Sequence, residues 1–122
     1  MLRYLLDTNI CIDVIKRRPQ ELLDTFNHHA GQMAISAITF SELINGVEKS
    51  AAPARNLAAV EDFCSRLDLL AYGPKASLHY GQIRAALERS GTPIGVNDLH
   101  IAAHARSEGL ASDPHHVRWP PS

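Results

Sequence analysis

Several features that define specialised classes of protein are missing from this 122-residue sequence or are rare in it. No apolar run approaches the roughly 20 residues that a membrane-spanning helix needs. Leu5-Leu6 leads directly into Asp7 instead of into a secretory signal core, and there is no internal repeat or low-complexity tract. The two cysteines, Cys11 and Cys64, lie in apolar helical patterns that are typical of small buried side chains. Nothing requires an oxidising compartment or a membrane partner, so we expect a cytoplasmic protein.

Charge of one sign is also scarce, because 12 Lys and Arg nearly balance 13 Asp and Glu and leave a formal net charge of −1. A protein that coats nucleic acid by bulk attraction is normally basic, so this balance argues against that class. It does not exclude a nuclease, since catalytic carboxylates lower the net charge and nucleic acid can be held by local patches and a metal ion. The hydrophobic fraction of 45% and the charged fraction of 20% are those of one ordinary globular domain.

Hydrophobic periodicity predicts strands that alternate with helices. Short apolar runs indicate strands at 3–6, 32–36 and 69–72, and apolar side chains recur at helical spacing between them. The helices should begin near residues 8, 21, 39, 53, 77 and 97, with Pro53 as a helix start and Asn97 as a helix N-cap. This order predicts an α/β fold in which a small parallel sheet carries helices on its faces. Ligands of such folds lie beyond the carboxyl ends of the strands.

Three carboxylates stand at positions where a simple surface charge is not expected. Asp7 ends a buried strand, Glu42 lies one turn into its helix, and Asp98 lies in a first helical turn, in phase with the apolar side. Carboxylates that meet in one place repel one another unless they are protonated or bound to a cation. Oxygen ligands suit Mg²⁺ or Mn²⁺, which can activate water and stabilise the charge of a phosphodiester transition state.

Each of these acids also fits an ordinary structural role. Asp7 can cap the helix that follows it, and Asp98 can interact with a helix dipole. Glu42 taken alone fits a solvated helix residue. Spacing in the sequence does not decide between these roles and a shared metal site.

The seven histidines offer a second possible metal site. His100 and His104 are four residues apart, a spacing that can place two ligands on one helix face. No Glu or Cys completes a familiar ligand set, so we interpret both as polar surface histidines and the pairs at 28–29 and 115–116 as exposed. A metal-free ribonuclease with histidine as general base stays open, although no histidine ends a strand.

Basic side chains near the acids are candidates for phosphate contacts. Arg84 and Arg89 lie on the helix that leads into Asp98, which favours them over the basic run at 16–18. A run such as 16–18 is usually a solvated helix end. The glycine-containing loop at 91–95 lacks the length and the lysine of a P-loop, so we interpret it as a positioning loop.

Five ordered blocks of the sequence carry a family resemblance. They are LLDTN at 5–9, ISAITFSELINGVEKS at 35–50, RNLAAVEDFCSRL at 55–67, GQIRAALERSGTPIGVND at 81–98 and LHIAAHARSEGL at 99–110. In this order and at these separations they resemble a PIN domain. More narrowly, they resemble the VapC-type ribonuclease toxins of bacterial type II toxin–antitoxin pairs.

The resemblance implies a three-layer α/β/α PIN-like domain over residues 1–110. It places Asp7, Glu42 and Asp98 on the family's metal-binding and catalytic acids, with Mg²⁺ or Mn²⁺ as the cofactor. Thr8 and Asn9 would order the site. The resemblance further implies hydrolysis of a structured RNA such as tRNA, and neutralisation by a cognate antitoxin whose tail enters the cleft.

A long apolar stripe on the helix that begins at Pro53 indicates a partner surface. It is longer than a short helix on a small sheet needs, and it comprises Leu57, Val60, Phe63, Cys64 and Leu67. We therefore expect part of it, or the neighbouring helices, to contact the antitoxin or a second copy of the chain in a homodimer.

The sequence departs from the family pattern after Leu110. The family continues with a strand, a Thr/Ser–Asn/Asp motif and a final strand, whereas this chain continues ASDPHHVRWPPS. The prolines at 114, 120 and 121 are turn signals, so residues 111–122 form an atypical tail and the C-terminal strands are atypical or missing. Residues 116–119 could supply a substitute strand and Asp113 a substitute carboxylate. A truncation or a change of reading frame near residue 111 is equally consistent with the sequence.

The altered tail has a physical consequence for the strand at 3–6. Either residues 116–119 pair beside it, or one side of this strand stays open and the domain is unstable. In either case we expect hydrolysis to be weak compared with a chain that carries the complete motif.

Two rival functions remain open. One is a PIN-like protein that binds its antitoxin but no longer cleaves, and the altered tail favours it. The other is an aspartyl phosphatase of the haloacid dehalogenase type. That chemistry wants a second acid two residues after the nucleophile, and Asn9 stands there instead.

Overall fold

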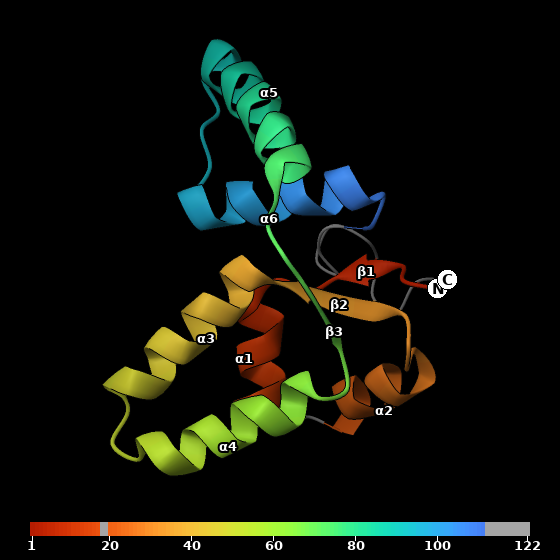
Figure 1. The fold of residues 1–122 in the computed structure, drawn as a ribbon, viewed down its shortest axis with the longest axis vertical. Coiled ribbons are helices and arrows are strands. Elements are labelled where there is room, and N and C mark those ends of the chain that lie inside the picture. Colours follow the sequence, from red (N-terminus) through yellow and green to blue (C-terminus); the bar gives the residue numbers. More distant parts are fainter. Residues whose placement is uncertain (18–19, 112–122) are drawn as a thin grey trace.

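A short parallel sheet separates two layers of helices in the computed structural model, which describes residues 1–17 and 20–111 (Figure 1). The strands are β1 (Tyr4–Leu5), β2 (Met33–Ser36) and β3 (Asp68–Leu70), in the order β1-β2-β3. All pairs are parallel, with Tyr4 opposite Met33 and Ala34 opposite Asp68. Parallel strands need crossover connections, so every strand leads through helices before the next strand begins.

The helices form the two outer layers of an α/β/α arrangement. One layer holds α1 (Thr8–Arg17), α2 (Gln20–His28), α3 (Ala37–Lys49) and α4 (Pro53–Cys64). The other holds α6 (Val96–Glu108), and α5 (Pro74–Ser90) packs on α6 on the side away from the sheet (Figure 1). Within the described part of the chain, no helix is long and apolar enough to cross a membrane.

Successive side chains of β1 and β2 point into two different cores. Tyr4, Leu6 and Ile35 pack in one buried cluster with apolar residues of α1, α3 and α4. Leu5 and Ala34, which lie between them in the sequence, pack in a second buried cluster with side chains of α6. This alternation follows from the period of two in a strand, and it explains why the strand sequences are apolar throughout.

The predicted α/β class and three-layer architecture are confirmed, with shifts at several element ends. The helix expected from residue 39 begins at Ala37 because Ser36 caps it, accepting a hydrogen bond from the Ile38 amide at 3.1 Å. The helix expected from residue 77 begins at Pro74, whose fixed φ suits a first helical turn. The strand expected at 69–72 occupies Asp68–Leu70 instead. Pro53 starts α4 as predicted.

The second edge of β1 is paired at the last described residue. The Leu5 amide donates to the Ala111 carbonyl at 3.0 Å, and the Ala111 amide donates to the Arg3 carbonyl at 3.0 Å. Tyr4 and Ala111 form a parallel bridge. Gly109, which ends α6 with a φ of 70°, turns the chain into this position. The expectation of an open side on this strand is therefore wrong at residue 111. The proposed substitutes, 116–119 and Asp113, lie outside the described residues.

This pairing predicts that the backbone amide of residue 111 stabilises the fold. Ala111→Pro removes the donor to the Arg3 carbonyl, and we expect the free energy of unfolding to fall by about 1–3 kcal/mol. Ala111→Ser keeps the amide and is the matched control. Urea denaturation monitored by circular dichroism measures both. Equal stability of the two variants would show that the bridge contributes nothing.

Candidate active site

Asp7 stands where β1 gives way to α1. Its Oδ1 accepts a hydrogen bond from the Ile10 amide at 2.8 Å, so Asp7 caps α1. The next residue, Thr8, donates from its hydroxyl to the Thr39 hydroxyl at 3.4 Å, and Thr39 is fully buried on α3. The capping role proposed from the sequence is thus confirmed. Capping through one oxygen uses only part of a carboxylate's about four acceptor positions, so it does not exclude a second role.

Glu42 connects α3 to α6. Its Oε1 accepts a hydrogen bond of 2.7 Å from Nδ2 of Asn97, a residue 55 positions later in the chain. Glu42 is partly buried, whereas Asn97 is exposed. The expected N-cap role of Asn97 is wrong, because α6 begins one residue earlier at Val96 and Gly95 occupies the cap position. The side-chain amide of Asn97 donates to the Glu42 carboxylate and does not cap α6.

Asp98 follows Asn97 in the first turn of α6 and is exposed. The expectation that it faces the apolar side of its helix is wrong. All residues from 91 to 98 are exposed, and burial of α6 begins at Leu99. The first turn of α6 therefore projects beyond the layer that covers the sheet, which leaves the Asp98 carboxylate accessible to solvent.

Hydrogen bonds thus join the segments that carry the three acids. Thr8 links the start of α1 to α3, and Asn97 links the start of α6 to α3. Yet within residues 1–17 and 20–111, no group of three or more His, Cys, Asp or Glu side chains is close enough to hold a metal ion. The donor chemistry suits Mg²⁺ or Mn²⁺, because carboxylate oxygens are their preferred ligands and Mg²⁺ keeps several waters. The joint metal site stays a prediction.

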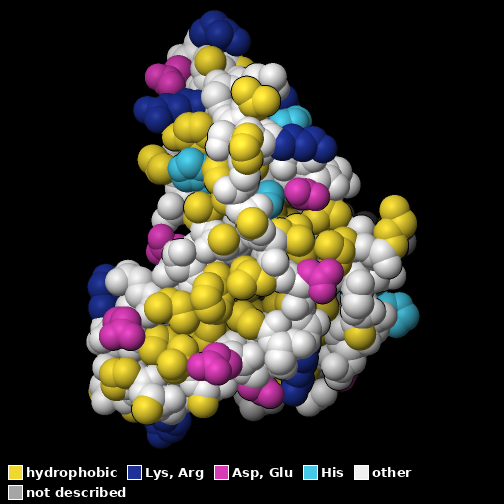
Figure 2. Space-filling model, in the orientation of Figure 1, with side chains coloured by type: hydrophobic (Ala, Val, Ile, Leu, Met, Phe, Trp, Pro, Cys, Tyr) yellow, Lys and Arg dark blue, Asp and Glu magenta, His cyan; other side chains and the backbone are white. Residues whose placement is uncertain are grey.

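A buried histidine anchors α6 to the end of β2. His104 is 1% exposed, and its Nδ1 lies 2.8 Å from the Ser36 hydroxyl. The Tyr72 ring meets the His104 ring edge-on at 5.4 Å, and the Tyr72 hydroxyl lies 2.8 Å from Nδ1 of His100. Tyr80 stacks on His100 with ring centroids 4.2 Å apart. Histidine side chains accordingly gather where α5 meets α6 (Figure 2).

The interpretation of these histidines as surface residues is therefore wrong for His104, and His100 is partly buried. His29 is also buried, at 7% exposure, contrary to expectation, whereas His28 is exposed. Residues 115–116 lie outside the described residues. Burial lowers the pKa of His100, and the positive charge of Arg84 lowers it further. Burial raises the pKa of the Tyr72 hydroxyl.

The two candidate phosphate-binding arginines differ in their surroundings. Arg84 donates to Glu88 at 3.0 Å and to the Tyr80 hydroxyl at 2.9 Å. Arg89 lies in the last turn of α5 and is exposed. Both are on α5, which leads through the exposed loop at 91–95 into Asp98.

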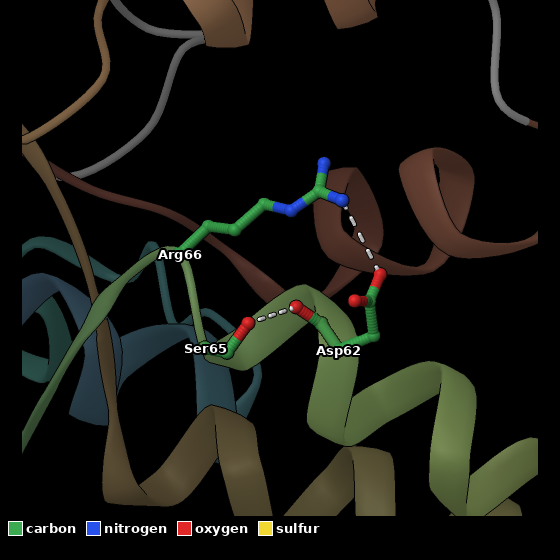
Figure 3. Close-up of polar contacts among 3 residues, drawn as sticks. All are labelled: Asp62, Ser65 and Arg66. Carbon is green, nitrogen blue, oxygen red and sulfur yellow. Dashed lines mark hydrogen bonds and ion pairs between the residues drawn. The ribbon is translucent and has the colours of Figure 1, made fainter.

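An apolar pocket of about 170 Å³ lies on the other layer, between α1, α2 and α4. It is lined largely by apolar side chains, among them Leu23, Phe26, Phe63 and Leu67. Arg66 also lines it, and its Nη2 lies 3.5 Å from Asp62 (Figure 3). This exposed ion pair is weak, so the guanidinium can exchange one carboxylate partner for another.

The apolar stripe of α4 serves mainly the fold. Val60 and Phe63 are buried in the core, and Cys64 and Leu67 pack against it. Leu57 is 36% exposed. Burial raises the pKa of the Cys64 thiol and, together with the charge of Asp7, that of Cys11, which suits unreactive side chains.

The sequence pattern does not single out Ser36 and Thr39, and it predicts other roles for Asn97 and His104 than linking the site segments. Ser36, Thr39, Asn97 and His104 each make a hydrogen bond to a distant element. Ser36 and Thr39 sit in the resemblance block at 35–50, and both are polar residues among apolar ones at a helix start. Such a pattern indicates a buried polar group that needs a partner, but it does not name the partner.

Comparison with known proteins gives the family. The PIN-domain family model matches residues 4–112. The chain belongs to the PIN-domain family. Ribonuclease VapC2 of Haemophilus influenzae is 60% identical over 110 residues, which cover 90% of this chain and 83% of that protein. A protein of Salmonella typhimurium named tRNA(fMet)-specific endonuclease VapC is 52% identical over 118 residues, 97% of this chain and 89% of that protein. The resemblance to the VapC type is confirmed.

Solved structures agree with this assignment. The crystal structure of DNA-bound VapBC from Salmonella typhimurium is 55% identical, with a TM-score of 0.88, and covers 90% of this chain and 83% of that chain. VapBC2 from Rickettsia felis, bound to a DNA fragment from its promoter, is 37% identical with a TM-score of 0.86, covering 89% and 84%.

Burial of His104 predicts a pH-dependent stability. Burial lowers its pKa, and this effect outweighs Glu108 and the Ala71 backbone, which act in the opposite direction. The unfolded chain therefore binds the extra proton more readily, and the stability that depends on neutral His104 is lost as the pH falls below about 6.5. We expect the unfolding free energy of wild type, relative to His104→Asn, to fall between about pH 7.5 and pH 5. Urea titrations across this range measure it. A rise towards acid would mean that folded His104 is charged.

Proposed function

We propose that this protein is a metal-dependent endoribonuclease toxin that cleaves a structured RNA and is neutralised by an antitoxin. The observation that carries the proposal is that Asp7, Glu42 and Asp98 stand on three segments that hydrogen bonds join at one end of the sheet. The names of the relatives, ribonuclease and tRNA(fMet)-specific endonuclease, support RNA hydrolysis and make tRNA the first substrate to test.

In this proposal, Asp7, Glu42 and Asp98 hold Mg²⁺ or Mn²⁺. The ion, when bound, supplies an activated water and stabilises negative charge on the phosphodiester. Asn97 orients the Glu42 carboxylate through the 2.7 Å hydrogen bond. Thr8 fixes the start of α1, and therefore Asp7, against α3. The exposure of Asp98 leaves the RNA backbone access to the site.

Arg84 and Arg89 are the proposed contacts to RNA phosphates. Of the two, Arg89 is the more available, because Arg84 already donates to Glu88 and Tyr80. Their position on α5 extends the site along the helix that leads into Asp98. Single arginines next to the site would engage phosphates without a net positive charge on the chain.

The activity assay compares matched carboxylate variants. We expect Glu42→Gln and Asp98→Asn each to reduce cleavage of tRNA in Mg²⁺ or Mn²⁺ by at least about 100-fold, because a neutral amide is a poor ligand for a hard cation. Glu48→Gln, on the same helix as Glu42, and Asp62→Asn, on α4, alter exposed carboxylates away from the site. Both variants should leave cleavage unchanged. Gel analysis of end-labelled tRNA gives the rates.

The outcome of this assay also distinguishes a ribonuclease from the rival function, a protein that binds an antitoxin but no longer cleaves RNA. If the wild type binds an antitoxin but cleaves no RNA with either metal, the protein is a binding member of the family that has lost catalysis. Vigorous cleavage that depends on Asp98 would instead contradict the expectation that the atypical tail weakens the site.

The antitoxin is proposed to occupy the apolar pocket between α1, α2 and α4. The related solved structures are of VapBC, a family of toxin–antitoxin systems. The pocket offers an apolar floor with Phe26 and Phe63, and Arg66 at its wall is available for an acidic group. An apolar side chain next to a carboxylate on the antitoxin would fit both features. Pairing of two copies through part of the α4 stripe, where Leu57 is 36% exposed, or through the neighbouring helices stays a prediction.

A pair of leucine variants tests the pocket. Leu23 lines it from α2, whereas Leu57 on α4 does not. We expect Leu23→Asn to weaken binding of the antitoxin of the Salmonella typhimurium VapBC complex by about 10-fold or more, since one buried leucine contributes about 1.5–3 kcal/mol. Leu57→Asn should bind within about twofold of wild type. Calorimetric titration measures both. Equal weakening by the two substitutions would place the antitoxin elsewhere.

A further inference from the structure

The contact between His104 and Ser36 has a defined direction. Ser36 is fully buried, and its Oγ accepts a hydrogen bond from the Ile38 amide at 3.1 Å. The hydroxyl has one hydrogen, and Nδ1 of His104 lies 2.8 Å away. A hydroxyl also has a second lone pair, so the distance alone fits either ring tautomer. Donation to Nδ1 gives the hydroxyl hydrogen a partner, and on that ground we assign Nδ1 as the acceptor and the proton of the neutral ring to Nε2.

The surroundings of Nε2, the other ring nitrogen of His104, agree with a proton on Nε2. Nε2 is buried, and no hydrogen bond of good geometry reaches it from the described residues. A weaker hydrogen-bonding interaction joins the His104 ring to the backbone of Ala71, just after β3. The edge-on contact with Tyr72 at 5.4 Å limits rotation of the ring. His104 therefore has one good polar contact, and that contact is with Ser36.

This hydrogen bond is one of two that join the start of α3 and its first turns to α6. Ser36 precedes Glu42 by six residues, which is about 9 Å along a helix. His104 follows Asn97 by seven residues, which is about 10 Å. The two hydrogen bonds, Ser36 to His104 and Asn97 to Glu42, are therefore separated by a similar distance along each helix. From the first bond to the second, residue numbers rise along α3 and fall along α6. Two such points fix both the slide and the rotation of α6 against α3.

We propose that His104 is a positioning residue which, through Ser36, sets α6 against α3 so that Asp98 and Asn97 are held in register with Glu42. The proposal rests on the proposed function of this acidic site. His104 itself does not reach the site, because it lies six residues, about 9 Å, beyond Asp98 on α6. Its effect is on geometry, and it would act through the Asn97–Glu42 hydrogen bond. Loss of a hydrogen-bond partner of a metal ligand typically lowers metal affinity or activity 10- to 100-fold.

Two amide substitutions separate positioning from packing. In His104→Asn the side-chain oxygen takes the place of Nδ1 and can accept the Ser36 hydrogen bond. In His104→Gln the amide extends to the place of Nε2 and loses that bond, although glutamine is closer to histidine in size. Positioning predicts that asparagine is the better replacement, and packing predicts glutamine, because asparagine leaves a cavity.

We expect His104→Gln to lower kcat for tRNA cleavage and to weaken Mn²⁺ binding by about 10-fold or more, with KM unchanged within about twofold. His104→Asn should retain most of both. A kinetic assay and calorimetric Mn²⁺ titration measure these, at a temperature where circular dichroism shows both variants folded. A folded His104→Gln with wild-type kcat and Mn²⁺ affinity, or a His104→Asn as impaired as His104→Gln, would overturn the proposal.

Nuclear magnetic resonance gives a readout that does not depend on catalysis. We expect the ¹⁵N shifts of His104 to show an unprotonated Nδ1 and a protonated Nε2. The side-chain amide of Asn97 should shift and exchange faster in His104→Gln and not in His104→Asn, because its bond to Glu42 loosens. An Nδ1-protonated ring or an unmoved Asn97 amide would reject the positioning role. If wild type fails to cleave RNA or does not depend on Asp98, the proposed function fails, and the Asn97 amide alone decides the positioning.

Discussion

The burial of β1 and β2 on both faces is the constraint on which the rest of the structure depends. A strand of two or four residues makes too few backbone hydrogen bonds to hold a sheet together. Its side chains must therefore be buried on both faces of the sheet. Tyr4 and Leu5 are consecutive and enter different cores, and that single alternation requires one helical layer against each face. Parallel pairing then directs the strand ends to one edge, where α1 and α3 both begin.

The proposed acidic site depends on that edge and not on any local motif. Asp7 comes from the first strand end and Glu42 from the helix after the second, while Asn97 and Asp98 come from the opposite layer. The proposed site would therefore span the sheet edge from one helical layer to the other. Two hydrogen bonds, at Thr39 and at Asn97, connect its parts. Any displacement of α6 relative to α3 changes the separation of the carboxylates directly.

The sequence was a good guide wherever local chemistry determines structure. Pro53 starts a helix and Asp7 caps one because fixed φ and a short carboxylate act within a few residues. It was a poor guide wherever the partner is distant. Asparagine is among the side chains that cap helices best, but the Asn97 amide donates to Glu42 instead. His104 has the polarity of a surface residue, and only tertiary structure provides Ser36 to satisfy it. Helical phase predicts that Asp98 faces inward, but phase does not show where a helix extends past its layer.

The pairing of Ala111 with β1 ties the order of synthesis to the order of assembly. Residues 3–5 are translated before residue 111, yet one of their two neighbouring strand positions is filled by that last described residue. The pairing of β1 on both sides therefore cannot be completed until residue 111 has been made. Asp7, Glu42 and Asp98 all precede Ala111, so they are translated before β1 can be paired on both sides. A polypeptide that ends before residue 111 would leave the backbone of β1 with one side unpaired, which is the kind of strand that pairs with other chains.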